Sequence, residues 1–383
     1  MNRNSFIRNA IIKYATIFIF FCGQTASALD FTDSKDKTVN RGTFLLPNEM
    51  DTYLYKPLIE GKKDILLSVG TFRALFLASM GDFSRLIMFD HDVLVTKFNN
   101  NNLLLIKCLG ELEWPLELQR MQYIALLNYR YLGDEQITNM QSNINKNDFD
   151  QMKILMKNLR SMPLINLDDV APKLRPIVEE IHTIFQLSAY RNSNFERPKS
   201  ESQRAYTSRN IFKEFSKSLD RFEVIYWGSN EKWKKIQDMI ELDKIMVING
   251  NLSGEYELKA LSEQLKANNE KISIMDVSNA PIAIAFSEIQ AVDEDASKEF
   301  VNNLTYLPFA KNSYLLSSQV RDIKVYEWFY YHIKIETLFN CLKIIDEKEK
   351  NYCFYKVIKE HSRLPSKKPK NIKNTDNNNL LLN

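Results

Sequence analysis

The sequence predicts an α/β protein with a doubly wound, mostly parallel sheet and a large helical insertion. Short apolar runs that end in glycine or acidic residues occur over residues 64–92, and similar runs alternate with amphipathic segments over residues 222–335. Parallel strands need a long crossover, usually a helix, so this alternation is typical of a parallel sheet. Between the two regions, residues 94–220 carry apolar side chains at the 3.6-residue period with few strand signals, which indicates helices.

The first region predicts one strand–helix–strand unit. Residues 64–70 (DILLSVG) form a short buried strand that ends at a glycine, and residues 71–80 (TFRALFLASM) form an apolar helix without internal Gly or Pro. Residues 84–90 (SRLIMFD) form a second buried strand, which ends in Asp90. With a right-handed crossover the two strands are parallel, so their carboxyl ends meet at one edge of the sheet.

Strand signals return after residue 212. The pattern predicts strands at 244–248 and 271–276, shorter strands at 304–309 and 313–316, helices at 231–242 and 255–267, a closing strand within 325–338, and either a strand or a helix end at 222–227. A polar segment at 191–206 predicts a loop within the insertion. The α/β domain therefore spans residues 64–361.

The first 28 residues have the three parts of a cleavable secretory signal peptide. Basic residues without acids come first, an apolar run follows at 14–22 (YATIFIFFC), and Ala26-Ser27-Ala28 supplies a small-residue cleavage site. The sequence therefore predicts a mature chain that starts at Leu29 and is secreted or periplasmic. The alternative is a buried N-terminal helix.

Two further segments flank the predicted domain. Residues 29–63 are polar and predict an irregular N-terminal extension, and residues 362–383 are rich in Lys, Pro and Asn and predict a disordered basic tail. The whole chain has a formal charge of +3; the signal removes three bases, and the tail holds five bases against one acid, so the body is mildly acidic. An acidic body argues against nucleic-acid binding. We expect no membrane span in the mature chain.

The cysteine pattern does not predict a disulfide framework. Cys22 leaves with the signal, so Cys108, Cys341 and Cys353 remain. One bridge is possible, with Cys341–Cys353 the favoured pair, and a third thiol would be left over. A body of this length can build its own apolar core.

The strongest chemical pattern is Gly70 with Asp90 twenty residues later. A glycine at a strand end lets the backbone approach a ligand, the next helix start offers N–H groups, and an acid on the following strand can accept the hydroxyl hydrogens of a ribose. The full dinucleotide pattern needs three glycines, and this turn has one. The alternative is an ordinary strand–helix turn with a solvated Asp90.

Later strands add polar groups to the same predicted edge. Residues 248–252 (INGNL) and 275–281 (MDVSNAP) each follow a strand, where open α/β sheets bind their ligands. His91 lies between two acids, which would raise the pKa of its imidazole; a solvated turn is the alternative. Serine-hydrolase, phosphate-loop and zinc-protease motifs do not occur in the sequence.

The order of these features resembles the class I S-adenosylmethionine-dependent methyltransferases. Their first strand ends in a glycine turn, their second in an acid for the ribose, and later turns flank adenine and face the methyl group. The resemblance covers residues 64–92 and 222–335. It implies S-adenosylmethionine as cofactor, cofactor-binding roles for Gly70, Thr71, Asp90, Asn251, Leu252 and Ser278, and catalytic roles for Asp276 and Asn279.

The chain also departs from this family. Its first motif has one glycine, Asn251 stands where an acid is common, and an exported protein leaves the compartment in which adenosylmethionine is made. Two functions therefore remain open. One is a methyltransferase with an unknown acceptor. The other is an inactive scaffold that binds a protein partner through its helical insertion.

Overall fold

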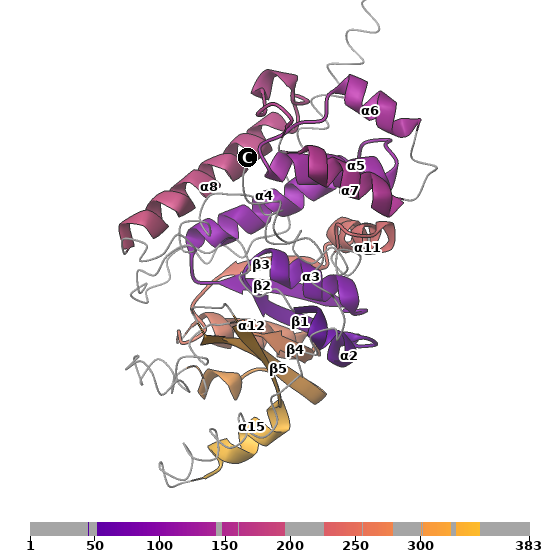
Figure 1. Ribbon diagram of the computed structural model, residues 1–383. Coiled ribbons are helices and arrows are strands. Elements are labelled where there is room, and N and C mark those ends of the chain that lie inside the picture. The colour runs from indigo at the N-terminus through magenta and orange to yellow at the C-terminus, as the bar shows by residue number, and fades with distance from the viewer. Residues whose placement is uncertain are drawn as a thin grey trace, which may run out of the picture.

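A computed structural model describes residue 45, residues 52–142, 148–159, 161–195, 226–254, 256–278, residue 300, and residues 302–322 and 327–344. Six strands form one sheet in the order β3-β2-β1-β4-β5-β6 (Figure 1). The strands are β1 (Ile65–Val69), β2 (Arg85–Asp90), β3 (Ile245–Asn249), β4 (Ile272–Asp276), β5 (Phe309–Asp322) and β6 (Glu327–Lys334). Only the β5–β6 pair is antiparallel. The predicted doubly wound, mostly parallel α/β fold is confirmed.

Helices cover both faces of this sheet. The elements before the insertion are η1 (Thr52–Tyr55), α2 (Lys56–Ile59) and α3 (Phe72–Met80). The insertion contains α4 (Val93–Gly110), α5 (Leu116–Leu127), α6 (Asp134–Gln141), α7 (Asp148–Asn158), η2 (Leu167–Asp169) and α8 (Arg175–Phe195). Further helices of the described residues are α11 (Asn230–Glu241), α12 (Glu257–Ala267) and α15 (Ile335–Leu342).

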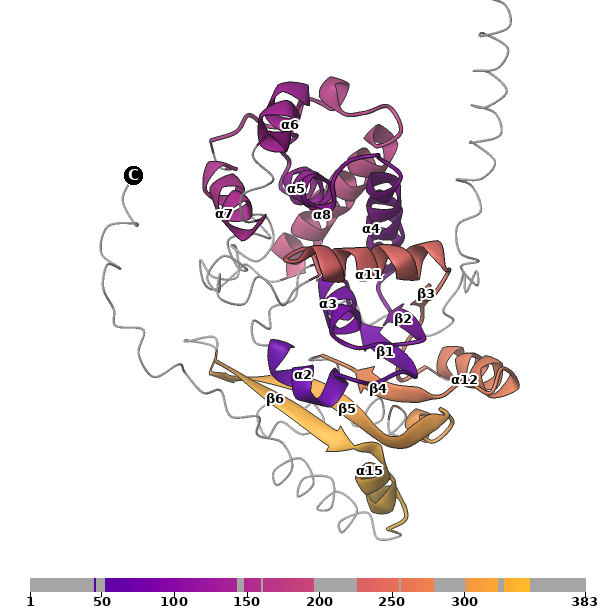
Figure 2. The ribbon, with the colours of Figure 1, turned by 90° about the vertical axis from the view of Figure 1, so that its right-hand side faces the viewer.

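Side chains alternate between two cores because successive residues of a strand point to opposite faces. Leu66 and Met88 belong to a large core shared with α3, α4, α5 and α11, whereas Leu67 and Phe89 belong to a second core shared with α12 and α15. Figure 2 shows α3 and α11 between the sheet and the insertion, and α15 at the opposite end. By this alternation, Asp90 and Asp276 lie on the face that the insertion covers.

The described residues of the predicted insertion form helices and the turns between them, with no strand. α4 starts after β2, where the Asp92 side chain accepts a hydrogen bond from the Leu94 N–H (2.8 Å) and thereby caps the helix. α4 then packs along α8 (Figure 1). Residues 191–195 continue α8, so that part of the predicted 191–206 loop is wrong. Among the described helices, none is long and apolar enough to cross a membrane.

Two other predictions need correction. Part of the predicted irregular extension, residues 52–59, is helical, and Tyr55 and Ile59 in it are completely buried. The two short strands predicted at 304–309 and 313–316 are wrong as separate elements. Residues 302–304 are helical, and β5 runs unbroken for 14 residues.

Several predictions lie outside the described residues. They are the signal peptide, most of the extension before residue 52, residues 222–225 and the basic tail. Cys341 is disulfide-bonded, with a partner that also lies outside the described residues, so the Cys341–Cys353 pairing stays a prediction. Cys108 is a buried cysteine that forms no disulfide.

Candidate ligand-binding site

The predicted site residues that the structure describes lie at the carboxyl ends of β1, β2, β3 and β4, or directly after them. Strand pairing aligns Val69 with Phe89, and Asp90 with Asn249. On the other side of β1, Ser68 aligns with Asp276. The strand order reverses between β1 and β4, and open α/β sheets bind ligands at such a switch point. The edge has two parts, which we call the β1–β4 junction and the β1–β2 edge.

A buried ion pair fills the β1–β4 junction. Arg73, in the first turn of α3, donates from Nε and Nη2 to the two carboxylate oxygens of Asp276 at 2.8 and 2.7 Å. The two side chains are 2% and 0% exposed. Ser68 Oγ donates a further hydrogen bond to Asp276 at 2.9 Å. Bidentate pairing satisfies both charges, as a carboxylate at this depth requires.

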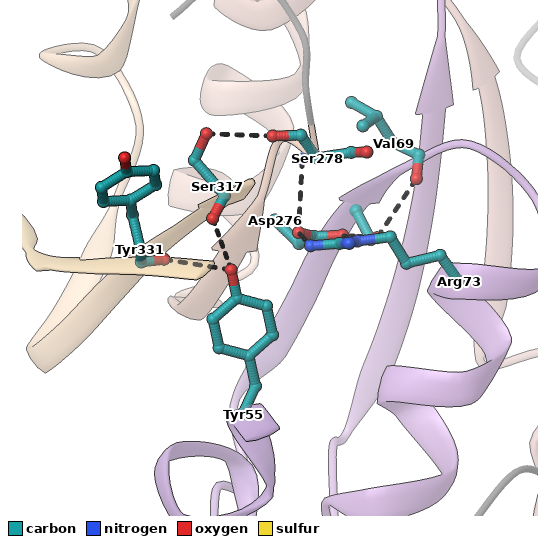
Figure 3. Close-up of polar contacts among 8 residues, drawn as sticks. Tyr55, Val69, Arg73, Asp276, Ser278, Ser317 and Tyr331 are labelled. Carbon is teal, nitrogen blue, oxygen red and sulfur yellow. Dashed lines mark hydrogen bonds and ion pairs between the residues drawn. The ribbon is translucent and has the colours of Figure 1, made fainter. Parts of the chain in front are cut away.

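Tyr55, from the segment before β1, also packs into the β1–β4 junction and contacts β5, β6 and Arg73. Its hydroxyl donates to the backbone carbonyl of Ser317 on β5 and lies 3.1 Å from the carbonyl of Tyr331 on β6 (Figure 3). The Arg73 guanidinium lies 5.6 Å from the centre of the Tyr55 ring. The sequence analysis missed both residues. A lone arginine inside the apolar segment 71–80 is the available signal, because a buried arginine needs a partner.

Asp276 and Ser278, both predicted site residues, belong to this closed junction. The Ser278 N–H lies 3.3 Å from an Asp276 carboxylate oxygen, and the Ser278 carbonyl accepts bonds from Ser317 Oγ and the Ser318 N–H, each at 2.9 Å. The Asp276 carboxylate is therefore directed at Arg73 inside the protein. Asn279, the other predicted catalytic residue, lies outside the described residues.

The β1–β2 edge is different because Gly70 leaves space there. Gly70 has φ +86°, and a Cβ built on it would meet no atom within 4 Å beyond its chain neighbours. Asn99, on α4, holds the Gly70 carbonyl through its Nδ2 at 3.0 Å. Thr71 follows but is buried, and its hydroxyl donates to the backbone carbonyl of Leu45. The backbone of Gly70, rather than the Thr71 side chain, can meet a ligand.

Asp90 ends β2 beside this glycine. Its side chain keeps 14% exposure, and its Oδ1 accepts a hydrogen bond from the Asp92 N–H at 2.9 Å. His91 Nδ1 lies 3.6 Å from the same oxygen on a side chain that is 49% exposed. Burial raises the pKa of Asp90 to about 6, against the opposing effect of His91 and the backbone of Asp92 and Gly70. A carboxylate with a raised pKa at a sheet edge is typical of functional sites.

The end of β3 supports Asp90 through its backbone. The Gly250 N–H donates to the Asp90 carbonyl at 2.9 Å, and Asn249 Nδ2 donates to the same carbonyl at 3.2 Å. A Cβ on Gly250 would lie 2.7 Å from the Phe89 ring and 2.8 Å from Glu257, so this close approach requires glycine.

Two predicted adenine-side residues have structural partners in the turn after β3. Asn251 Oδ1 accepts a hydrogen bond from the Ser253 N–H at 3.0 Å. Leu252 is 7% exposed and packs in the second core with α12, so little of its side chain remains to flank a base. Among the described residues there is no cluster of His, Cys, Asp and Glu that could hold a metal ion.

Comparisons with known proteins add one match. The model of a domain of unknown function (DUF7790) matches residues 186–373. This range includes β3, β4, β5 and β6, with Asp276, and leaves out Gly70 and Asp90. Comparison with curated proteins gives no match.

Proposed function

We propose that this chain binds a nucleoside, S-adenosylmethionine or a close relative, at the β1–β2 edge. The observation that carries the proposal is the partly exposed carboxylate of Asp90 beside the open side of Gly70. A carboxylate can accept two hydroxyl hydrogens at once, which suits the adjacent hydroxyls of a ribose. Gly70 lets the rest of the ligand approach the backbone closely.

Methyl transfer is the reaction that the resemblance implies for such a site. The bound cofactor would supply an electrophilic methyl group, and the residues of the chain would position the cofactor and the acceptor. Asp90 would hold the ribose, and the Arg73–Asp276 pair would form a rigid wall beside it. Because Asp276 is fully paired, its role in this proposal is orientation, and the rate gain would come from holding an acceptor close to the methyl group.

The second candidate function is that of a scaffold, which binds a protein partner and no longer catalyses methyl transfer. The filled β1–β4 junction favours it, because Arg73 and Tyr55 occupy the place where doubly wound sheets hold ligands. The insertion also exposes large apolar side chains at Ile154, Leu164 and Leu187. In this version the chain would bind a protein partner and would have no methyl acceptor.

Export is part of both versions, and the disulfide at Cys341 supports it. Disulfides persist in oxidising compartments such as the periplasm or the extracellular space. We therefore propose a secreted or periplasmic mature chain. Mass measurement of protein recovered from those fractions tests this, with Leu29 as the expected first residue. An intact Met1 there would contradict it.

Calorimetry with S-adenosylmethionine and S-adenosylhomocysteine tests the binding proposal. Asp90→Ala should weaken binding about tenfold to a hundredfold, because hydrogen bonds to charged groups contribute roughly 1.5–3 kcal/mol. Asp64→Ala is the matched control, since Asp64 is exposed just before β1 at the opposite end of the sheet. Folded wild-type protein that binds neither ligand at millimolar concentration would reject the cofactor and favour the scaffold.

A further inference from the structure

Asn99 carries a buried hydrogen-bond acceptor beside the candidate site. The residue is 1% exposed, and its Oδ1 accepts no hydrogen bond from any described residue. Its Nδ2 donates to the Gly70 carbonyl at 3.0 Å. Since a carbonyl can only accept, the amide nitrogen must face Gly70, which fixes Oδ1 as the atom that lacks a donor.

An acceptor left in this state is costly. A buried polar atom without a partner gives up its hydrogen bonds to water and gains none in return. Buried polar groups in native proteins are therefore nearly always satisfied by protein, ordered water or ligand. Asn99 is hydrogen-bonded directly to Gly70, and the side of Gly70 on which a Cβ would lie is open. The Asn99 amide and the open side of Gly70 therefore belong to the same part of the β1–β2 edge.

The charges around Gly70 indicate what kind of group would bind. The Asp90 carboxylate and Asn99 Oδ1 are both acceptors. The nearest guanidinium, that of Arg73, is already engaged by both oxygens of Asp276. Two acceptors near Gly70 favour a ligand that carries N–H donors.

We propose that Asn99 Oδ1 accepts a hydrogen bond from the ammonium of an amino-acid group on the bound nucleoside. The inference rests on the proposed function and deepens it: Asp90 recognises the ribose, and Asn99 selects ligands that carry the amino-acid group. Asn99 is thus a specificity residue supplied by the helical insertion. The glycine turn itself supplies only backbone.

Two nucleosides separate these roles on the full mature chain. S-adenosylhomocysteine has the amino-acid group, and 5′-methylthioadenosine has the same base and ribose without it. Asn99→Ala should weaken adenosylhomocysteine binding about tenfold to a hundredfold and leave methylthioadenosine binding within about twofold. Asp90→Ala should weaken both. Asn101→Ala is the control, because Asn101 is on the same helix and its Nδ2 donates to the Lys97 carbonyl of that helix at 3.0 Å.

The other outcomes distinguish a failure of the Asn99 inference from a failure of the proposed function. Equal losses for both nucleosides in Asn99→Ala would mean that Asn99 only holds the Gly70 carbonyl, and no loss would mean that a buried water satisfies Oδ1. Either overturns the inference and leaves the proposed function standing. Wild-type protein that binds methylthioadenosine but not adenosylhomocysteine would overturn it as well. Binding of neither nucleoside overturns both, and melting temperatures verify that each variant is folded.

Discussion

The β1–β4 junction and the β1–β2 edge lie on either side of β1, and each contains one carboxylate, but the two carboxylates differ in exposure and in their partners. At the junction, Asp276 is 0% exposed and bonded by Arg73 and Ser68. At the edge, the Asp90 side chain is 14% exposed, and the half-exposed imidazole of His91 lies 3.6 Å from its Oδ1. One carboxylate is neutralised within the fold, and the other is left available.

This difference separates a structural carboxylate from a candidate functional one. A paired, fully buried ion holds its elements in place, here α3 against β4. A carboxylate whose pKa rises to about 6 destabilises the folded state at neutral pH, and such a residue is a candidate for binding or catalysis. Position at a strand end alone does not distinguish the two.

The largest expected effect is at the junction. Asp276→Asn should lower the free energy of unfolding by about 3–5 kcal/mol, because it leaves the Arg73 charge buried without its partner. Urea denaturation measures this. Arg73→Met should be comparably destabilising, and the double variant should recover much of the loss.

The exposed ion pair between Lys235 and Asp82 provides the comparison for that experiment. Its side chains are 28% and 66% exposed, with an N–O distance of 2.8 Å. Asp82→Asn should change stability by less than about 1 kcal/mol, as surface pairs usually do. Similar effects at Asp82 and Asp276 would contradict the structural role of the junction.

The second effect is on Asp90 and has the opposite sign. The pKa of Asp90 is higher in the folded chain than its ordinary 3.8, so its stabilising contribution is complete below about pH 4 and is lost as pH rises through about 6. Asn mimics the protonated form at every pH. Asp90→Asn should therefore raise the free energy of unfolding at pH 7 by up to about 3 kcal/mol, with almost no change at pH 4.

Denaturation of wild type and Asp90→Asn at pH 4, 6 and 7 measures this difference. Nucleoside affinity of the wild type should fall as pH drops below about 6, where the carboxylate gains a proton and loses one acceptor site. A variant that is less stable than wild type at pH 7 would show that Asp90 is structural.

The third effect is at the glycine turn. Gly70→Ala should cost about 1–2 kcal/mol of stability, because its φ of +86° is unfavourable for a residue with a Cβ. The added methyl group enters open space, so it should block a ligand more than it disturbs the core. Gly250→Ala is the contrast: its methyl group would collide with Phe89, so it should act through packing, at roughly 1–3 kcal/mol. Thermal melts and calorimetry on both variants separate these causes.

The sheet was predictable because buried parallel strands are continuous apolar runs. β1, β2, β3 and β4 lie within about one residue of their predicted bounds. β5 was predicted in pieces because Lys311 and Asn312 interrupt its apolar pattern, and Asn312 has φ +61°. β4 pairs with Phe309 before this interruption and with Tyr314 after it, across a register shift, and β6 pairs with β5 from Tyr314 on.

The candidate site was less predictable, since its partners are distant in sequence. Gly70 and Asp90 were identified because one short strand–helix–strand unit joins them. The Arg73–Asp276 pair spans 203 residues, and no local pattern reveals such a contact. Leu252 was expected beside a ligand, but the apolar side of α12 buries it. Asn99 gave no sequence signal because its neighbours in the chain are three further asparagines, Asn100, Asn101 and Asn102.

The smallest effect concerns Asp92, which lies two residues from Asp90 and tests how local the site is. Its side chain accepts the Leu94 N–H at 2.8 Å and caps α4. Asp92→Ala should cost about 1 kcal/mol of stability, whereas Asp92→Asn should cost only a few tenths, because Asn caps helices as well as Asp does. In the wild type, the negative charge of Asp92 raises the pKa of Asp90. Both variants remove this charge, so both should lower the pKa of Asp90 slightly. Nucleoside affinity at pH 7 should stay within about twofold of wild type in both, since Asp90 is already mostly ionised there. Melting temperatures, calorimetry and an NMR titration of Asp90 measure the three quantities. A loss of affinity in Asp92→Asn as large as that in Asp90→Ala would place the ligand on the α4 start instead of on Asp90.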